Sequence, residues 1–280
     1  MHTMQAIITG TVQGLSEFLP ISSSAHIMFS NELYEIITGI KNASGSLQEE
    51  IFFSIVVHLA TLFAVIIYFF NDLKEICIGF FNSLKNKDFK NKDFKIVNYI
   101  ILATIITGII GLLIKDKVEQ LVSNPQIICI LLFATGVILL LSEKMYKGNK
   151  EISLKITILV AIAQGLAVFP GFSRSGFTIS TALFCGMDRL KAARFSFLMS
   201  IPIIFLASMI YPLFELDFNL ISTFNHKAII FGFLSSFIIG YLCIKYFMKL
   251  LAKLGLKIFG YYCLTVAIMM FGLFQVYYHQ

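Results

Sequence analysis

The sequence predicts an all-α polytopic membrane protein, and three observations support this prediction. Hydrophobic residues make up 58% of the 280-residue chain and charged residues 14%, whereas average soluble domains have about 45–50% and about 25%. The mean hydropathy is also high, at +0.84. Long uncharged runs recur along the chain, and a soluble fold would leave several of them exposed to water. The composition excludes a disordered chain, a nucleic-acid-binding protein and a secreted disulfide scaffold.

Six of the uncharged runs are long enough, or nearly so, to cross a bilayer, which takes about 20 apolar residues. These predicted spans are residues 51–70, 96–114, 126–142, 195–214, 228–244 and 258–278. No soluble domain accompanies them, so we expect residues 1–280 to form a single integral membrane domain.

Two further apolar regions are interrupted near their middle. Residues 156–187 would make a straight helix that is too long for a hydrocarbon core about 30 Å thick, and their middle reads Phe-Pro-Gly-Phe-Ser. Residues 4–30 are interrupted by Leu-Pro-Ile-Ser-Ser-Ser. Such Pro and Gly positions end helices. We therefore expect two re-entrant helical hairpins whose half-helices meet near the midplane, where broken backbone must be buried in protein or line a wet cavity.

The basic residues predict the orientation of these segments. If both hairpins return to the side from which they enter and the N-terminus is outside, 17 of the 22 Lys and Arg residues lie inside. The inside segments are 71–95, 143–155, 188–194 and 245–257, and the outside basic residues are Lys41, Lys115, Lys117 and Lys227. The positive-inside rule strongly favours this arrangement.

The two interrupted regions share a sequence pattern. Gln-Gly-Leu at 13–15 precedes Phe-Leu-Pro-Ile-Ser-Ser-Ser, and Gln-Gly-Leu at 164–166 precedes Phe-Pro-Gly-Phe-Ser-Arg-Ser. Three predicted spans follow each copy, and the two copies enter the membrane from opposite sides. We therefore expect an inverted-topology repeat of approximately 1–142 and 151–280, with the working site where the broken helices meet.

Glu17 and Arg174 are the only charged residues deep in the two predicted hairpins. An ionisable residue within the bilayer is energetically unfavourable, so it faces the protein interior and has a partner. One interpretation is a purely structural ion pair between the hairpins. The other is an anion site, because an arginine and two helix N-termini can together bind a phosphate or a carboxylate.

The polar neighbours of these two charges favour the anion site. They are Gln13, Ser22, Ser23 and His26 in the first hairpin, and Ser173, Ser175 and Thr178 in the second. An acid and a histidine beside bound phosphate can transfer protons or supply a nucleophile. By contrast, His58 lies alone in a predicted span, and we expect it to make an interhelical hydrogen bond.

These residues resemble the undecaprenyl-diphosphatases of bacterial membranes, also called bacitracin-resistance proteins. The first motif is Gln13-x-x-x-Glu17 followed by Phe-Leu-Pro-Ile-Ser-Ser-Ser-Ala-His, and the second is Pro-Gly-Phe-Ser-Arg-Ser-Gly-Phe-Thr at 170–178. The likeness covers essentially the whole chain. The chain departs from the family pattern at three positions, with Ala25 and Ala60 where glycine is common and Cys263 where arginine often stands. None of the three is one of the proposed catalytic or binding residues.

The resemblance implies hydrolysis of undecaprenyl diphosphate to the monophosphate and phosphate, which recycles the lipid carrier for peptidoglycan and other envelope glycans. It implies a multi-pass protein of the bacterial cell membrane with a site open to the outer face. It also implies a divalent cation, Mg²⁺ or Ca²⁺, with Glu17 as a ligand or base. The implied catalytic residues are Glu17, Ser23, His26 and Arg174, and the implied substrate-binding residues are Gln13, Ser22, Ser173, Ser175 and Thr178.

Three questions stay open at this point. The attacking group is Ser23, His26 or a metal-bound water. The partners are the polyprenyl diphosphate substrate and membrane lipids, and the sequence does not decide between a monomer and a homodimer. Because inverted repeats are typical of transporters, a lipid or small-anion transporter or flippase at the same site is the alternative function. A type 2 phosphatidic acid phosphatase is excluded, because Ser180 stands where that class requires histidine.

Overall fold

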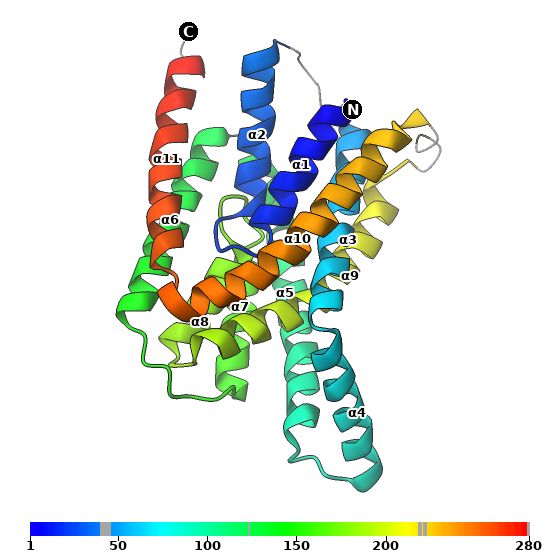
Figure 1. Cartoon of the computed structure of the whole chain (residues 1–280), viewed down its shortest axis with the longest axis vertical. Helices are drawn as coiled ribbons and strands as arrows, with labels where there is room; N and C mark the ends of the chain where they lie inside the picture. The colour runs from blue at the N-terminus through cyan, green and yellow to red at the C-terminus, as the bar shows by residue number, and fades with distance from the viewer. Residues whose placement is uncertain (40–45, 123, 218–219, 221–222, 279–280) are drawn as a thin grey trace.

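The computed structural model describes residues 1–39, 46–122, 124–217, 220 and 223–278, and eleven α-helices run through them (Figure 1). The helices are α1 (Thr3–Ser16), α2 (Ser23–Thr38), α3 (Leu47–Tyr68), α4 (Phe70–Asn86), α5 (Lys92–Val122), α6 (Pro125–Lys144), α7 (Leu154–Leu166), α8 (Arg174–Phe184), α9 (Arg189–Glu215), α10 (His226–Leu254) and α11 (Lys257–Tyr278). The prediction of an all-α protein is confirmed.

Six of these helices, namely α3, α5, α6, α9, α10 and α11, are long and apolar enough to cross a membrane. They coincide with the six predicted spans, so the prediction of a multi-pass membrane protein is also confirmed. The helices run beyond the predicted limits. For example, α10 continues through the lysines of 245–253, and α5 continues to Val122. Lys41, one of the predicted outside residues, lies beyond the described residues.

Four helices are too short to cross a membrane: α1, α2, α7 and α8 have 14, 16, 13 and 11 residues. Residues 17–22 separate α1 from α2, and residues 167–173 separate α7 from α8, at the two predicted interruptions. Each second helix begins behind a serine cap, Ser22 or Ser173. The helices of each pair pack against each other.

A seam of small residues holds α1 against α10. A Cβ atom on Gly14 would lie 2.7 Å from the carbonyl oxygen of Ser236, and one on Gly10 would lie 2.4 Å from that of Gly232. Small residues allow such a close approach of two helix backbones within a membrane. The seam therefore fixes the position of α1, which ends immediately before Glu17.

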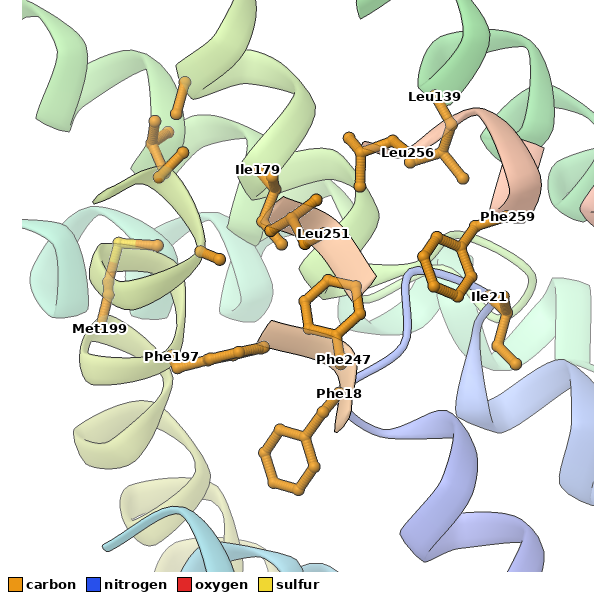
Figure 2. Packing of buried hydrophobic residues seen from close by; sticks show 14 of the residues in the cluster. Phe18, Ile21, Leu139, Ile179, Phe197, Met199, Phe247, Leu251, Leu256 and Phe259 are labelled. Carbon is orange, nitrogen blue, oxygen red and sulfur yellow. The ribbon is translucent and has the colours of Figure 1, made fainter. Parts of the chain in front are cut away.

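Aromatic packing anchors the turn that follows α1 (Figure 2). Phe18 is fully buried and meets Phe197 of α9 edge to face, with ring centroids 5.5 Å apart. Phe197 also contacts Phe247 of α10, at 5.9 Å. Edge-to-face pairs add to the stabilisation that burial supplies. Because Phe18 is the immediate neighbour of Glu17, this packing holds the backbone of Glu17 between α9 and α10.

Candidate functional site

The turns at 17–22 and 167–173 lie against each other, and hydrogen bonds at their ends join them. The N–H of Gly171 donates to Ser24 Oγ at 3.4 Å, and Ser175 Oγ donates to the carbonyl of Leu19 at 3.0 Å. Gly171 has a φ of +99°, which favours glycine. A Cβ atom there would lie 2.5 Å from the carbonyl oxygen of Ile128. The starts of α2 and α8 are thereby held together.

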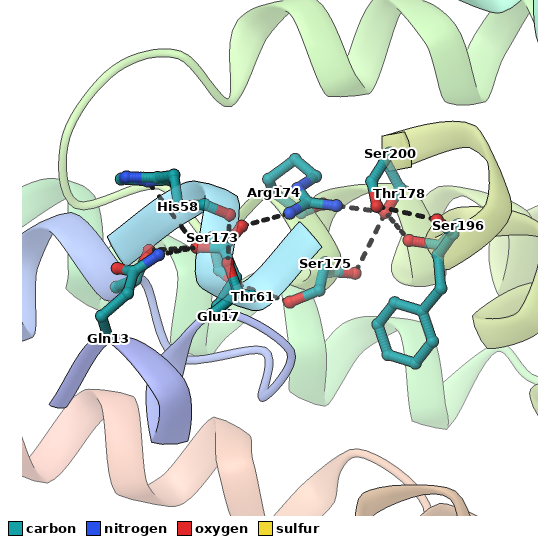
Figure 3. A network of polar contacts seen from close by, with 12 residues as sticks. Gln13, Glu17, His58, Thr61, Ser173, Arg174, Ser175, Thr178, Ser196 and Ser200 are labelled. Atoms are coloured by element: carbon teal, nitrogen blue, oxygen red, sulfur yellow. Dashed lines mark hydrogen bonds and ion pairs between the residues drawn. The ribbon is translucent and has the colours of Figure 1, made fainter. Parts of the chain in front are cut away.

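The carboxylate of Glu17 is the centre of the polar contacts at this junction (Figure 3). Its Oε1 accepts a hydrogen bond from Nη2 of Arg174. Its Oε2 accepts from Gln13 Nε2 at 3.0 Å and from Ser23 Oγ at 2.9 Å. Glu17 is buried, so these partners replace the water that a carboxylate otherwise requires.

Arg174 has a donor to spare. Its Nη1 is buried and has no hydrogen-bond partner among the described residues. A buried donor without an acceptor is unfavourable by about 1–3 kcal/mol, and more when it is charged. Arginine presents a planar fork of donors that matches the oxygens of a phosphate or carboxylate. The unpartnered nitrogen therefore indicates an anion as the missing acceptor.

A cavity of about 240 Å³ lies at this junction, and Glu17, Ser23, Ser173 and Arg174 contribute to its lining. The helices α2 and α8 both begin at these lining residues. The first N–H groups of a helix lack partners within it and carry a partial positive charge. The cavity, called the polar pocket below, is thus suited to an anion.

His58 also lines the polar pocket, which its sequence context did not predict. Its Nδ1 lies 2.7 Å from the carbonyl oxygen of Ser54, one turn earlier in α3, so the expected interhelical hydrogen bond is wrong. Its Nε2 lies 3.9 Å from Oε2 of Glu17. One signal was available in the sequence: an ionisable residue in a span is itself a candidate functional residue.

His26 lies elsewhere. Its Nδ1 is 2.9 Å from the carbonyl of Ser22, and its Nε2 is 2.9 Å from the hydroxyl of Tyr262. The two rings stack, with centroids 5.6 Å apart. His26 and Tyr262 line a separate, largely apolar cavity of about 450 Å³. His26 therefore braces the start of α2, at Ser22, rather than facing Glu17.

The other predicted site residues make contacts that hold the starts of α2 and α8. Thr178 Oγ1 donates to the carbonyl of Arg174 at 2.8 Å and lies 2.6 Å from Ser196 Oγ on α9. Ser22 Oγ caps α2 by accepting from the N–H of Ala25 at 3.4 Å. Ser173 Oγ accepts from the N–H of Gly176 at 3.1 Å. These contacts fix the first turns of α2 and α8, which carry Ser23 and Arg174.

The oxygen atoms at the site could bind a divalent cation if oxygen atoms of the substrate completed its coordination. The described residues contain no group of three His, Cys, Asp or Glu side chains able to form a complete metal cage. Beside Glu17, however, Oε1 of Gln13 is buried and has no partner in the described part of the chain. Mg²⁺ is usually bound by one or two carboxylates together with phosphate oxygens and water. Glu17 fits that pattern as the carboxylate, and the amide oxygen of Gln13 beside it could serve as a further oxygen ligand, of the kind that Ca²⁺ also accepts.

The chain is similar to known proteins over nearly its whole length. Residues 6–269 match the family model described as bacitracin resistance protein BacA. An undecaprenyl-diphosphatase of Methanobrevibacter smithii is 40% identical, with 97% of each chain covered. Undecaprenyl-diphosphatase 2 of Halalkalibacterium halodurans is 39% identical, with 98% of this chain and 97% of the relative covered. An undecaprenyl-diphosphatase of Treponema denticola is 38% identical, with 96% of each chain covered.

Proposed function

The chain belongs to the BacA family of bacitracin resistance proteins, and we propose that it hydrolyses undecaprenyl diphosphate to undecaprenyl phosphate and phosphate. One observation locates this reaction in the molecule. The Nη1 of Arg174 is buried without a partner among the described residues, and Arg174 lines the same pocket as Glu17 and Ser23 in a multi-pass membrane protein. The product is the lipid carrier used in the synthesis of peptidoglycan and other envelope glycans. The family description links these proteins to bacitracin resistance.

The terminal phosphate of the substrate binds in the polar pocket. The free nitrogen of Arg174 and the N-terminal N–H groups of α2 and α8 supply donors to its oxygens. In phosphoryl transfer, negative charge spreads over these oxygens in the transition state, so catalysis depends mainly on positioned donors. Arg174 is held in place by Glu17, and this fixed orientation reduces the reorganisation needed during the reaction.

Ser23 is the nucleophile in this proposal, because its hydroxyl already donates to Glu17 Oε2 at 2.9 Å. A hydroxyl bonded to a base is the usual arrangement of an activated nucleophile. Ser23 Oγ attacks the terminal phosphorus, its proton passes to Glu17, and the bond from that phosphorus to the bridging oxygen breaks. Undecaprenyl phosphate leaves with the bridging oxygen. Water then hydrolyses the phosphoserine, which releases phosphate and restores the hydroxyl.

A divalent cation, Mg²⁺ or Ca²⁺, held by Glu17 and Oε1 of Gln13 would neutralise charge on the diphosphate oxygens. Gln13 also donates to Glu17, so it orients the carboxylate that receives the proton. His26 acts on the same step indirectly, because it holds the carbonyl of Ser22 next to the nucleophile.

We further propose that α1–α2 and α7–α8 are re-entrant hairpins in two inverted repeats, approximately 1–142 and 151–280, and that the polar pocket opens to the outer face. Three observations support this topology. The four helices are short, the lysines and arginines concentrate in four segments, and the start of α1 and the end of α11 lie at the end of the molecule opposite the α4–α5 hairpin (Figure 1).

Phosphate release from undecaprenyl diphosphate by the purified protein in detergent tests the function. We expect turnover that a chelator suppresses, and a phosphoserine at Ser23 in acid-quenched samples analysed by mass spectrometry. The Ser23→Ala variant should show neither turnover nor a phosphoserine. A transporter without hydrolase activity would release no phosphate, so this assay also separates the alternative function. Turnover in Ser23→Ala close to that of the wild type would exclude Ser23 as the nucleophile.

A further inference from the structure

A second cavity adjoins the polar pocket. It lies between the spans α3 and α9, which pack against each other, and has a volume of about 380 Å³. We call it the α3–α9 groove, and its walls are formed by Ile51, Ser54, Ile55, Ile204, Ala207 and Ser208. Its lining is mainly aliphatic, and its size falls within the range of about 300–1,000 Å³ typical of small-molecule sites.

The groove and the polar pocket are adjacent. His58 and Ile204 line both cavities. The imidazole of His58 faces Glu17 on one side, with its Nε2 3.9 Å from the carboxylate, and borders the groove on the other. The polar lining of the pocket around Glu17 and the aliphatic lining of the groove are therefore separated by the width of one side chain.

Such a junction fits an amphipathic ligand whose charged group and hydrocarbon chain are directly connected. A prenyl diphosphate is this kind of molecule. When its terminal phosphate meets Arg174, the tail must leave the pocket through an apolar path, because hydrocarbon in contact with water is unfavourable. The α3–α9 groove offers an apolar lining beside the polar pocket, and it lies between two membrane-spanning helices.

A rival path exists beside His26. That cavity lies against α1, α10 and α11 and shares only Ser16 with the residues that line the polar pocket. The hydroxyl of Ser16 is directed to the carbonyl of Val12 in its own helix, and the stacked rings of His26 and Tyr262 form part of the wall. The α3–α9 groove shares two lining residues with the polar pocket, whereas the rival cavity shares one, so the groove is the more closely apposed of the two.

We propose that the α3–α9 groove binds the first isoprenoid units of the polyprenyl tail, so that the substrate enters the polar pocket sideways from the bilayer. This proposal rests on the hydrolysis of undecaprenyl diphosphate at Glu17, Ser23 and Arg174. The remainder of the tail stays in the surrounding lipid. Residues of the groove then determine how much a long tail contributes to binding, while the polar pocket performs the chemistry.

Filling the groove tests the proposal. Ala207 and Ser54 are exposed on its walls, so Ala207→Phe and Ser54→Phe add bulk without disturbing the core. Ala252→Phe is the matched control, because Ala252 is an exposed alanine on α10 outside the groove. For each variant, kcat/KM is measured with undecaprenyl diphosphate and with farnesyl diphosphate, whose tail is short. Thermal unfolding in detergent confirms that each variant folds.

We expect the ratio of kcat/KM for the long substrate to that for the short one to fall at least about tenfold in both groove variants, which is the lower end of the discrimination that an apolar pocket provides. Ala252→Phe should keep the wild-type ratio. An unchanged ratio in both groove variants would overturn the proposal, and so would a fall produced instead by Ile258→Phe in the cavity beside His26. Absence of hydrolysis by the wild type would contradict the proposed function instead.

Crosslinking provides a second measurement that does not depend on turnover. A polyprenyl diphosphate that carries a photoreactive group in its first isoprenoid unit should label peptides of α3 and α9. Labelling confined to α10 and α11 would place the tail in the rival cavity and contradict the proposal. Excess unlabelled undecaprenyl diphosphate should prevent the specific labelling.

Discussion

Glu17 and Arg174 pair directly although 157 positions separate them in the chain. Only one of the two terminal guanidinium nitrogens of Arg174 is used in this contact, and the other is buried without a partner among the described residues. The pair therefore both joins the two turns and leaves a donor for a phosphate oxygen. The structural interpretation of these two charges, as an ion pair, and the functional one, as part of an anion site, are therefore compatible. Substitutions can measure the contribution of each role.

Replacing Arg174 with lysine separates the two roles. Lysine keeps the charge and can still pair with Glu17, but it lacks the planar fork that binds two acceptors at once. We expect Arg174→Lys to lower kcat about a hundredfold, the usual effect of losing one transition-state donor. Turnover at saturating undecaprenyl diphosphate is the measurement, with folding checked by thermal unfolding. A kcat within about threefold of the wild type would mean that Arg174 acts only as a structural partner.

Glu17→Gln should lower turnover at least about a hundredfold, since general acid–base groups contribute about 10²–10⁴ in rate. Glu17 is the only acid among the described residues that line the polar pocket, so no neighbour can replace it. The variant also leaves Arg174 without its counter-charge, so its stability must be measured separately. Glu151→Gln is a suitable control, because Glu151 pairs with Lys191 at the exposed surface, away from the pocket.

The two histidines should respond differently to substitution. His58 lines the polar pocket, and its Nε2 lies 3.9 Å from Glu17 Oε2, so we expect it to position the diphosphate. His58→Leu should then raise KM several-fold, whereas His58→Gln, which keeps a polar side chain, should restore much of the loss. His26→Ala should instead reduce kcat at least about tenfold, because the start of α2 loses its brace beside the nucleophile. Loss of kcat in both His58 variants would assign His58 to the chemical step.

The seam between α1 and α10 should tolerate no side chain at Gly14. A Cβ atom added at position 14 would lie 2.7 Å from the carbonyl oxygen of Ser236, so α1 would have to move. We expect Gly14→Ala to destabilise the protein by about 1–3 kcal/mol, as overpacked cores do, and to lower the melting temperature in detergent. Gly108→Ala is the control, since a Cβ atom there meets nothing within 4 Å. Equal melting temperatures for the two variants would contradict a tight seam.

Accessibility can test the orientation. A cysteine at Lys87 should be protected from a membrane-impermeant thiol reagent in intact cells, and a cysteine at Lys117 should react. Both lysines are exposed, so burial within the protein does not explain a difference. The exposed Cys77 should first be replaced with serine to reduce the background. Labelling of Lys87→Cys from outside would reverse the proposed topology.

The sequence predicted the features that depend on local composition. The six spans follow from apolar run length, and the two interruptions follow from Pro and Gly beside serine caps. Glu17 and Arg174 stood out because charge is rare within a bilayer. All of these features are properties of short segments, so they do not require knowledge of how the helices are arranged.

The features that were missed depend on the relative rotation and distance of helices. His58 faces Glu17 because α3 presents that side to α1, and nothing in the residues around His58 specifies this rotation. The Tyr262 partner of His26 lies 236 positions away in the chain. Lone polar residues in apolar spans have many possible partners, and the packing of α1 with α10 and of α3 with α9 selects among them.

The contacts between the turns also have a consequence for biosynthesis. Ser24 and Leu19 meet Gly171 and Ser175, and Glu17 meets Arg174. A ribosome makes the chain from its N-terminus, so Glu17 enters the membrane well before its counter-charge exists. Until the second turn is synthesised, Gln13 and Ser23 are the hydrogen-bond partners that the first part of the chain supplies to this carboxylate. A chain truncated before residue 174 would lack both this counter-charge and the hydrogen bonds that join the second turn to the first.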